Sequence, residues 1–523
     1  MRFIFLALVL TGMVSCQVKD FGKLPDDVQV ALDSAKDNQA ELMKVITHYS
    51  EKETDSLKLK AAYFLIANMP EHSYVKAKLV DTAKHLVKFN VLDYPDYKTM
   101  VKAWDSVEST IGSIDYVRDT VIYDINTIKS DYLIKNIDLA FQAWNYPWAK
   151  FLSFDEFCEY VLPYRGSNEP IEDWRESLMK KYHYLIDSMK DTTNPIEMAS
   201  LINNEIKSWY KFDARFYRHP TDLGFDEMLH YKMGRCEDMT NLAIYAMRSM
   251  GVPVMSDYVP YWPNTGNNHA WNATLTKDHK VVIFMGGLDN PGEYKLNNKK
   301  AKVYRKTYAH QKDALVHLAP EYEALPPWLG YDAYIDVTAD YVPVRDVVVN
   351  LTETQPDSVH FAYLAVFNSG EWKAIHWGQI DSVKRQATFT DMGLDIVYMP
   401  AYYKKKDLLP AAYPFILDSS GQQHLLKPDT TLKITLTSYS TTARTIVKTT
   451  DGIKESNFEA GKMYSLFYWD GEWEKIGEEI AKNTTPLVFE NVPSGALYWL
   501  TVEDSNKEER IFTIDNEGKQ IWW

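Results

Sequence analysis

The chain has 523 residues, of which 46% are hydrophobic and 25% are charged, and its formal net charge is −15. At about 100–200 residues per domain, this length predicts three to five folding units, and the composition is that of an ordinary folded protein. The acidic balance argues against a nucleic-acid partner, because a phosphate backbone is bound by basic patches.

The first sixteen residues predict an export signal. Arg2 precedes an almost continuously apolar run over residues 3–14, which is too short to span a bilayer. The run ends at Ser15-Cys16 and resembles a bacterial lipoprotein signal, which implies that Cys16 is lipidated and becomes the new N-terminus. A plain signal peptide that contains a cysteine is the alternative. No run of about 20 apolar residues follows. We therefore expect an exported protein that a lipid tethers to the outer membrane of the bacterial cell envelope. Which face of that membrane it occupies stays open.

Residues 17–190 have the pattern of a helical domain. Apolar residues recur three or four positions apart in several segments, and Pro and Gly are sparse between them. We therefore expect an all-helical region. The segments with this period are 26–49, 55–68, 134–144, 154–162 and 171–189.

Residues 191–340 alternate helix and strand, which favours an α+β core. Gly251 stands where a left-handed residue would end the second helix. Helices are predicted at 195–211 and 236–250, and strands at 252–259, 270–275 and 281–285.

The last part of the chain is β-rich and contains an internal repeat. The segment Phe361–Trp372 matches Met463–Trp473, and both end in Gly-Glu-Trp, 101 positions apart. Further matches follow in the same order at nearly the same spacing. The repeat predicts two tandem β-sandwich-like domains, 341–427 and 428–523, with hairpin turns at the glycines.

Three cysteines occur, Cys16, Cys158 and Cys236. Cys158 lies in an aromatic, helical stretch and is interpreted as a small buried hydrophobe, although a disulfide between Cys158 and Cys236 stays open. An exported protein of this size without a disulfide framework leaves Cys236 as a candidate nucleophile.

The surroundings of Cys236 favour thiol chemistry. Cys236 begins the predicted helix, where the partial positive charge and free N–H groups of the helix terminus are expected to lower the pKa of the thiol. Its own N–H is a natural donor to an oxyanion. Gly234 allows a sharp turn and the close approach of a substrate.

His269 is the predicted base. It opens a strand in Asn268-His269-Ala-Trp271, from which one ring nitrogen can face the sulfur while the other requires an orienting acceptor. If strands 270–275 and 281–285 form a hairpin, Asp289 returns towards His269.

These motifs together resemble the transglutaminase-like core of bacteria over about 150 residues, and the whole arrangement resembles exported transglutaminase-like proteins of gut Bacteroidetes. The resemblance implies a papain-like fold with a Cys-His-Asp triad, in which Cys236 is the nucleophile, His269 the base and Asp289 the orienting acid. The tryptophan usual before the aspartate is missing, so Asp336, in Asp-Val-Thr after Trp328, is the alternative third member. The resemblance also implies a second oxyanion donor, for which Trp209 and Tyr231 are candidates.

The sequence therefore predicts a multidomain α+β protein with a helical N-terminal domain, a papain/transglutaminase-like core over 191–340 and two β-domains. We expect thiol-dependent acyl transfer on amides, chiefly peptide or amide hydrolysis by a cysteine protease or amidase, with a peptide or protein substrate such as cell-wall peptide. An inactive scaffold or a glycan- or protein-binding lipoprotein is the alternative. No cofactor is implied, and no metal motif such as His-x-x-x-His occurs.

Overall fold

The computed structural model describes residues 23–443, 447–448, 454–482, 485–505 and 508–523. The described residues form two compact units, the first within residues 23–72 and 123–134 and the second within residues 73–122 and 135–523. The predicted export signal and Cys16 lie outside the described residues. Within the described ranges, no helix has the length and apolar character needed to cross a membrane.

The first unit is helical, as predicted. It contains α1 (Asp26–Ser34), α2 (Gln39–Ser50) and α3 (Ser56–Ala67), which bury apolar residues three or four positions apart. The segment 26–49 is helical as expected, but it is divided: the chain turns at Lys36, whose φ is +52°, and passes through a 3-10 turn at Lys36–Asn38 between α1 and α2. Helix α5 (Ser130–Trp144) follows and matches the prediction for 134–144.

The expectation of an all-helical region over residues 17–190 is wrong at residues 73–123. Strands β1 (Ser73–Val80) and β2 (Asp115–Tyr123) pair with each other there, and α4 (Tyr97–Ile111) lies between them in the sequence. Both strands are rich in β-branched and aromatic residues, which favour extended backbone. The remaining helices before the core are α6 (Phe154–Tyr160), α7 (Arg175–Tyr182), α8 (Pro195–Trp209) and α9 (Phe225–Tyr231).

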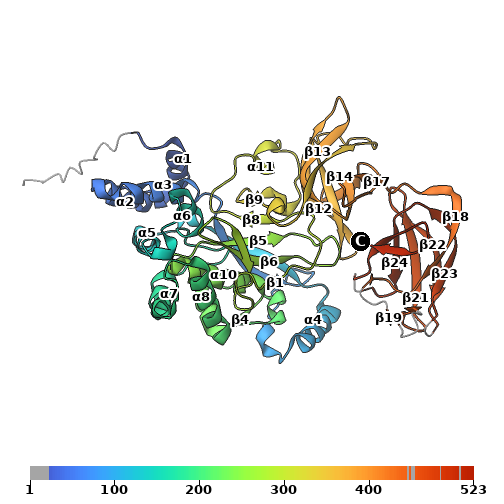
Figure 1. The fold of residues 1–523 in the computed structure, drawn as a ribbon, viewed down its shortest axis with the longest axis horizontal. Coiled ribbons are helices and arrows are strands. Elements are labelled where there is room, and N and C mark those ends of the chain that lie inside the picture. The colour runs from blue at the N-terminus through green and yellow to red at the C-terminus, as the bar shows by residue number, and fades with distance from the viewer. Residues whose placement is uncertain (1–22, 444–446, 449–453, 483–484, 506–507) are drawn as a thin grey trace, which may run out of the picture. The chain divides into compact units, whose positions relative to one another are not determined.

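The α+β core is an antiparallel sheet with α10 (Cys236–Ser249) packed on it (Figure 1). The strand order is β7-β6-β5-β8-β9, and the predicted hairpin of β6 and β7 is confirmed. The bounds are β5 Val254–Val259, β6 His269–Leu275, β7 Val281–Phe284, β8 Tyr304–Lys306 and β9 Tyr334–Asp336. A short helix, α11 (Leu315–Leu318), lies between β8 and β9.

Helix α10 is buried along every face except at Glu237. Its buried polar side chains form hydrogen bonds: the Thr240 hydroxyl donates to the carbonyl of Cys236 at 2.8 Å, and Arg248 donates to the carbonyl of Arg165 at 2.6 Å. Gly251 ends the helix with φ +72°, as predicted, and a β-carbon there would lie 2.3 Å from the carbonyl oxygen of Ala143. The chain therefore turns back into β5 at a position that only glycine fits.

The C-terminal part of the chain repeats its strand pairing, because the same neighbour pairs occur in both copies of the sequence repeat. The pairs β10-β13, β11-β12, β11-β14, β14-β16 and β16-β17 of the first copy correspond to β18-β23, β21-β22, β21-β24, β24-β25 and β25-β26 of the second. The bounds in the first copy are β10 Val344–Asn350, β11 Phe361–Asn368, β12 Glu371–Asp381, β13 Gln386–Gly393, β14 Ile396–Lys404, β15 Asp407–Pro410, β16 Phe415–Leu417 and β17 Gln423–Leu425. Those in the second copy are β18 Asp429–Ser438, β21 Met463–Trp469, β22 Trp473–Ile480, β23 Leu487–Ser494, β24 Tyr498–Val502, β25 Ile511–Ile514 and β26 Gln520–Trp522. A small hairpin of β19 (Val447–Lys448) and β20 (Lys454–Glu455) lies within the second copy.

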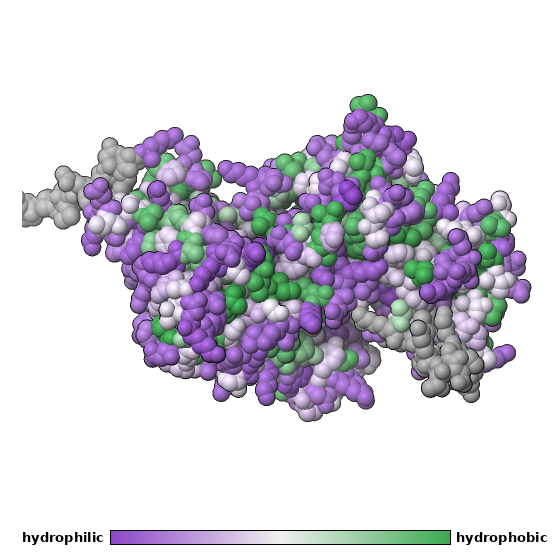
Figure 2. Space-filling view, viewed as in Figure 1, coloured by the Kyte–Doolittle hydropathy of each residue, from purple (hydrophilic) through white to green (hydrophobic). Residues whose placement is uncertain are grey.

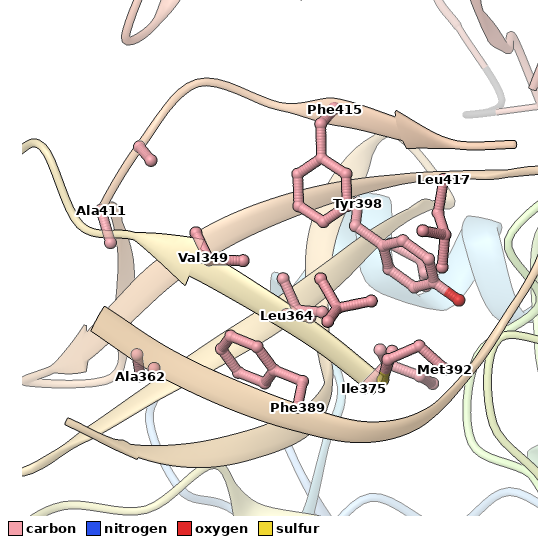
Figure 3. Close-up of a cluster of buried hydrophobic side chains, with 14 of the residues drawn as sticks. Val349, Ala362, Leu364, Ile375, Phe389, Met392, Tyr398, Ala411, Phe415 and Leu417 are labelled. Atoms are coloured by element: carbon pink, nitrogen blue, oxygen red, sulfur yellow. The ribbon is translucent and has the colours of Figure 1, made fainter. Parts of the chain in front are cut away.

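The sandwich prediction fits the second copy better than the first. In the second copy the β18-β23 pair and the five-stranded sheet are separate. In the first copy one sheet curls into a half-barrel, since the end of β12 also pairs with β13 and β14 pairs with both β11 and β16. Figure 3 shows the apolar side chains enclosed by this curl, among them Leu364, Phe389 and Tyr398. On the face in Figure 2, hydrophilic residues predominate and apolar ones form small scattered groups, in keeping with the acidic composition.

Candidate active site

Two short strands lead the chain into the helix that carries Cys236. Strand β4 (Met233–Gly234) pairs in parallel with β3 (Lys211–Phe212), and α10 begins two residues later. The carboxylate of Asp238 caps the helix by accepting from the N–H groups of Arg235 and Leu223, both at 2.9 Å. The capping box fixes the first turn of the helix and with it the position of Cys236.

Gly234 is required by packing. A β-carbon at this position would lie 2.4 Å from the Tyr210 hydroxyl oxygen and 2.7 Å from Cβ of Asp238. Its φ is not positive, so the sequence argument from a sharp turn was wrong. The glycine lets the capping carboxylate and Tyr210 close around the start of α10.

The thiol of Cys236 is bonded to its neighbour in sequence. Cys236 is 5% exposed, and its Sγ donates to Oε2 of Glu237 at 3.0 Å. The same oxygen lies 3.6 Å from Nε of Arg235, whose Nη2 donates to Asp222 at 2.6 Å. The thiol therefore borders a charged group of one arginine and two carboxylates.

These neighbours overturn the expectation of an acidic thiol. Burial raises the pKa of Cys236 most, and the charge of Glu237 and its hydrogen bond raise it further, against smaller opposing effects of the Glu237 N–H and of Arg235. The helix terminus is outweighed because removal from water and an adjacent carboxylate both disfavour the thiolate. Cys236 is thus a neutral thiol in this arrangement.

His269 opens β6, and its Nε2 lies 2.6 Å from the hydroxyl oxygen of Tyr294. Its ring stacks near those of Trp262 and Trp271, with centroids 6.4 and 5.9 Å away. Burial lowers the pKa of His269, and the charge of Glu237 opposes this shift. At neutral pH the imidazole is therefore uncharged and able to accept a proton.

Cys236 and His269 share two neighbours. Glu237 accepts from the thiol, and its charge acts on the imidazole. Tyr294 bonds the imidazole, and burial, Asp289 and Cys236 together raise the pKa of Tyr294 to about 12. Among the described residues, no hydrogen bond joins the sulfur directly to the imidazole. Each member of the predicted pair is thus held by another side chain, Cys236 by Glu237 and His269 by Tyr294.

Asp289 reaches this site through Tyr294. Its backbone pairs with Met285 across the turn after β7, and Asn203 of α8 donates to the Asp289 carbonyl at 2.9 Å. The charge of Asp289 acts on Tyr294. The Tyr294 hydroxyl, and not the predicted Asp289 carboxylate, is the group bonded to Nε2 of His269. Tyr294 lies five residues after Asp289 on the same returning segment, and no motif marks it.

The alternative third member, Asp336, is elsewhere. It lies on β9, which is separated from β6 by β5 and β8, so that at about 4.8 Å per strand the backbones are about 14 Å apart. Its carboxylate pairs with Lys302 and accepts from the N–H of Thr338. Asp336 therefore anchors a loop and does not orient His269.

Neither candidate for the second oxyanion donor contacts Cys236 within the described residues. The indole of Trp209 lies under the ammonium of Lys181, 4.1 Å from the ring centroid, and Tyr231 packs on Phe216 at 5.8 Å. Tyr217 does approach the sulfur: burial raises its pKa to about 12, and Cys236 and Glu237 contribute through their charges. Tyr217 lies in a short 3-10 helix, Ala214–Arg218, between β3 and α9, and no sequence motif marks it.

Cys158 is 2% exposed on α6, as predicted for a small hydrophobe. Cys158 and Cys236 are both free, which excludes a disulfide between them. In the part of the chain that the structure describes, no three His, Cys, Asp or Glu side chains gather as a metal site would need.

Comparison with known proteins bears on this site. Residues 183–283 match the family model described as the transglutaminase-like superfamily, a segment that runs from the end of α7 to β7 and includes Cys236 and His269. No curated protein matches the chain.

Proposed function

Residues 183–283 form a transglutaminase-like superfamily domain, and on this premise we propose that the chain carries out thiol-dependent acyl transfer on amides, with hydrolysis of a peptide or amide as its main reaction. The observation that supports this most is that Glu237 accepts from the Cys236 thiol while its charge acts on His269, whose imidazole bonds Tyr294. The superfamily resemblance assigns the nucleophile and base to these two positions.

In the proposed reaction, His269 takes the proton of Cys236 as the sulfur attacks the amide carbonyl carbon. The N–H of Cys236 and the Tyr217 hydroxyl stabilise the negative oxygen of the tetrahedral intermediate. The imidazolium then gives its proton to the leaving amine, the C–N bond breaks and a thioester remains on Cys236. Water, with its proton taken by His269, hydrolyses the thioester to a carboxylic acid and restores the thiol.

Tyr294 is proposed as the group that orients His269. Its hydroxyl bonds Nε2, which leaves Nδ1 as the nitrogen that turns towards the sulfur. Asp289 acts behind it by polarising the Tyr294 hydroxyl. A substrate that reaches the sulfur replaces Glu237 as the neighbour of the thiol.

An activated ester tests the proposal without knowledge of the natural substrate. With p-nitrophenyl acetate we expect a burst of about one nitrophenolate per chain and an acetyl group located on Cys236 by peptide mass spectrometry. Cys236→Ala abolishes the burst, His269→Ala slows it by about 100-fold or more, and Cys158→Ala leaves it unchanged. A burst that survives in Cys236→Ala contradicts the proposal. Added hydroxylamine separates transfer to an amine from hydrolysis.

The second candidate function is an inactive scaffold that binds a glycan or protein. The bond from the Cys236 thiol to Glu237 in place of His269 favours it. Failure of both Cys236 acetylation and His269-dependent alkylation in the folded protein is the result that would select this candidate.

We also propose the cell envelope as the location and the membrane surface as a partner, through lipid on Cys16. Cys16→Ser should move the protein from the membrane to the soluble fraction of its host. Equal membrane association of the variant and the unaltered chain contradicts the lipid anchor.

A further inference from the structure

The loop that precedes His269 determines what surrounds the imidazole. Residues 260–268 connect β5 to β6, and Trp262 at their start is 4% exposed. The ring of Trp262 stacks against His269 and against Trp271, at 6.4 Å between centroids in both cases. A shift of this loop therefore moves both the support of the imidazole and the start of its strand.

A single side chain of the first half-barrel holds this loop. Asn368 at the end of β11 is 2% exposed, and its Nδ2 lies 2.9, 3.0 and 2.9 Å from the carbonyl oxygens of Trp262, Thr265 and Asn267. Its two N–H groups are thus shared by three carbonyls of one loop. Because a buried carbonyl without a donor is costly, these bonds fix the loop more firmly than packing alone.

The neighbouring residue orients the amide. The hydroxyl of Ser369 donates to Oδ1 of Asn368 at 3.0 Å, and its oxygen accepts from the N–H of Asn267 at 3.3 Å. Asn267 has φ +65°, a conformation that non-glycine residues seldom adopt without support. The hairpin turn after β11 therefore bonds the loop at Asn267, two residues before His269.

The repeat indicates that the β-fold itself does not demand this asparagine. The strand registers make Asp470 the counterpart of Asn368, since Phe367 lies opposite Trp372 and Trp469 lies opposite Trp473. The side chain of Asp470 has no N–H donor, and its carboxylate accepts from the Tyr413 hydroxyl at 2.6 Å. The second domain instead sends Arg510 to the same loop, where Nη2 donates to the carbonyl of Pro263 at 2.5 Å. Both β-domains thus bind the histidine loop through polar side chains, although Nε of Arg510 also donates to the carbonyl of Trp523 in its own domain.

We propose that Asn368 is a positioning residue for His269, so that the first half-barrel completes the active site of the transglutaminase-like domain. This inference rests on the proposed function, since it concerns the same Cys236–His269 pair. Without the donors of Asn368, the carbonyls of the loop turn towards water, Trp262 loses its place and the imidazole no longer faces the sulfur.

Asn368→Asp tests the proposal in the full-length protein, because it keeps the shape of the side chain and removes its N–H donors. Asn350→Asp, on the exposed end of β10 in the same half-barrel, is the matched control. We expect Asn368→Asp to slow acetylation of Cys236 by p-nitrophenyl acetate about tenfold or more, because a misplacement of about 1 Å can reduce a rate by about 100-fold. Its pH profile should approach that of His269→Ala, and hydrogen exchange should accelerate in residues 260–268 while β11 and β12 stay protected.

The outcomes separate the two proposals. Equal acetylation rates in the unaltered protein and in His269→Ala contradict the proposed function and leave Asn368 no imidazole to position. A His269-dependent rate that Asn368→Asp leaves unchanged overturns only the positioning role. If Asn368→Asp exposes Cys158 to alkylation, the fold itself is lost, and Ser369→Ala then supplies the test. That variant removes the two hydrogen bonds of the Ser369 hydroxyl, to Asn368 and from the N–H of Asn267, and should lower the rate by a smaller factor. An unchanged rate in a folded Ser369→Ala protein would then overturn the role.

Discussion

Replacement of Glu237 by glutamine should make the Cys236 thiol more reactive. The substitution keeps an oxygen that accepts from the sulfur and removes the charge that lies 3.0 Å away. For two unit charges at this separation, the Coulomb energy is about 1.4 kcal/mol in a water-like medium and about 5.5 kcal/mol at an effective dielectric constant of about 20. The lower value corresponds to about a tenfold change in the thiolate fraction. Arg235, 3.6 Å from the Glu237 carboxylate, keeps its positive charge and adds to the effect.

Alkylation by iodoacetamide measures this change. The rate at Cys236 is followed by peptide mass spectrometry between about pH 6 and 9, with buried Cys158 as the internal reference for unfolding. Glu237→Gln should raise the Cys236 rate at pH 7 by about tenfold or more, and Glu474→Gln on β22 should leave it unchanged. An equal or lower rate in Glu237→Gln would refute the account of the thiol as a group held neutral by its neighbour.

Three further predictions concern the groups around the pair. Tyr294→Phe removes the partner of His269 Nε2 and should lower the acetylation rate about two- to tenfold, because one hydrogen bond contributes in that range. A larger loss of rate in Asp289→Asn than in Tyr294→Phe would show that Asp289 acts on His269 directly. Because burial lowers the pKa of His269, the acetylation rate should rise with pH, and the midpoint of that rise should lie below about pH 6.5. A midpoint above pH 7, or the same pH-dependent rise in His269→Ala, argues against His269 as the titrating base. Gly234→Ala should lower the free energy of unfolding by about 1–3 kcal/mol through its clash with Tyr210, and the added change Tyr210→Phe should recover part of that loss in thermal melts.

Local signals in the sequence predicted the elements of the core well. The apolar period of α10 and the glycine at 251 defined the helix, and the turn after β6 defined a hairpin. The repeat was visible because Gly-Glu-Trp recurs at a nearly constant spacing, and the shared strand pairing follows from it. These features depend on neighbours in sequence, which periodicity and turn residues report directly.

The parts that the sequence left undetected depend on distant contacts. The burial that keeps the Cys236 thiol neutral comes from the whole core, whereas the expected lowering of its pKa depends on the terminus of one helix alone. No motif marks Tyr217, in the 3-10 helix before α9, or Tyr294, in the loop after β7, as a neighbour of the sulfur or of the imidazole. Asn368 contacts a loop about 100 residues earlier, so no motif around His269 could include it.

The sheet order also settled a choice that spacing could not. Asp336 follows an aromatic residue in a pattern that suits the third member of a triad, yet three strand steps separate it from His269. Its pairing with Lys302 gives it a structural role.

The central claim is that Cys236 and His269 act as a pair, and a crystal structure of the protein with Cys236 alkylated by iodoacetamide tests it most directly. Alkylation removes the thiol proton that bonds Glu237 and places a carbonyl one methylene away from the sulfur, close to where the carbonyl of an acyl-enzyme would lie. We predict an imidazole nitrogen within about 4 Å of the sulfur, with Tyr294 still bonded to Nε2 and the adduct's carbonyl near the N–H of Cys236. An imidazole turned away from the sulfur, with Trp262 and Tyr294 unmoved, would contradict the account.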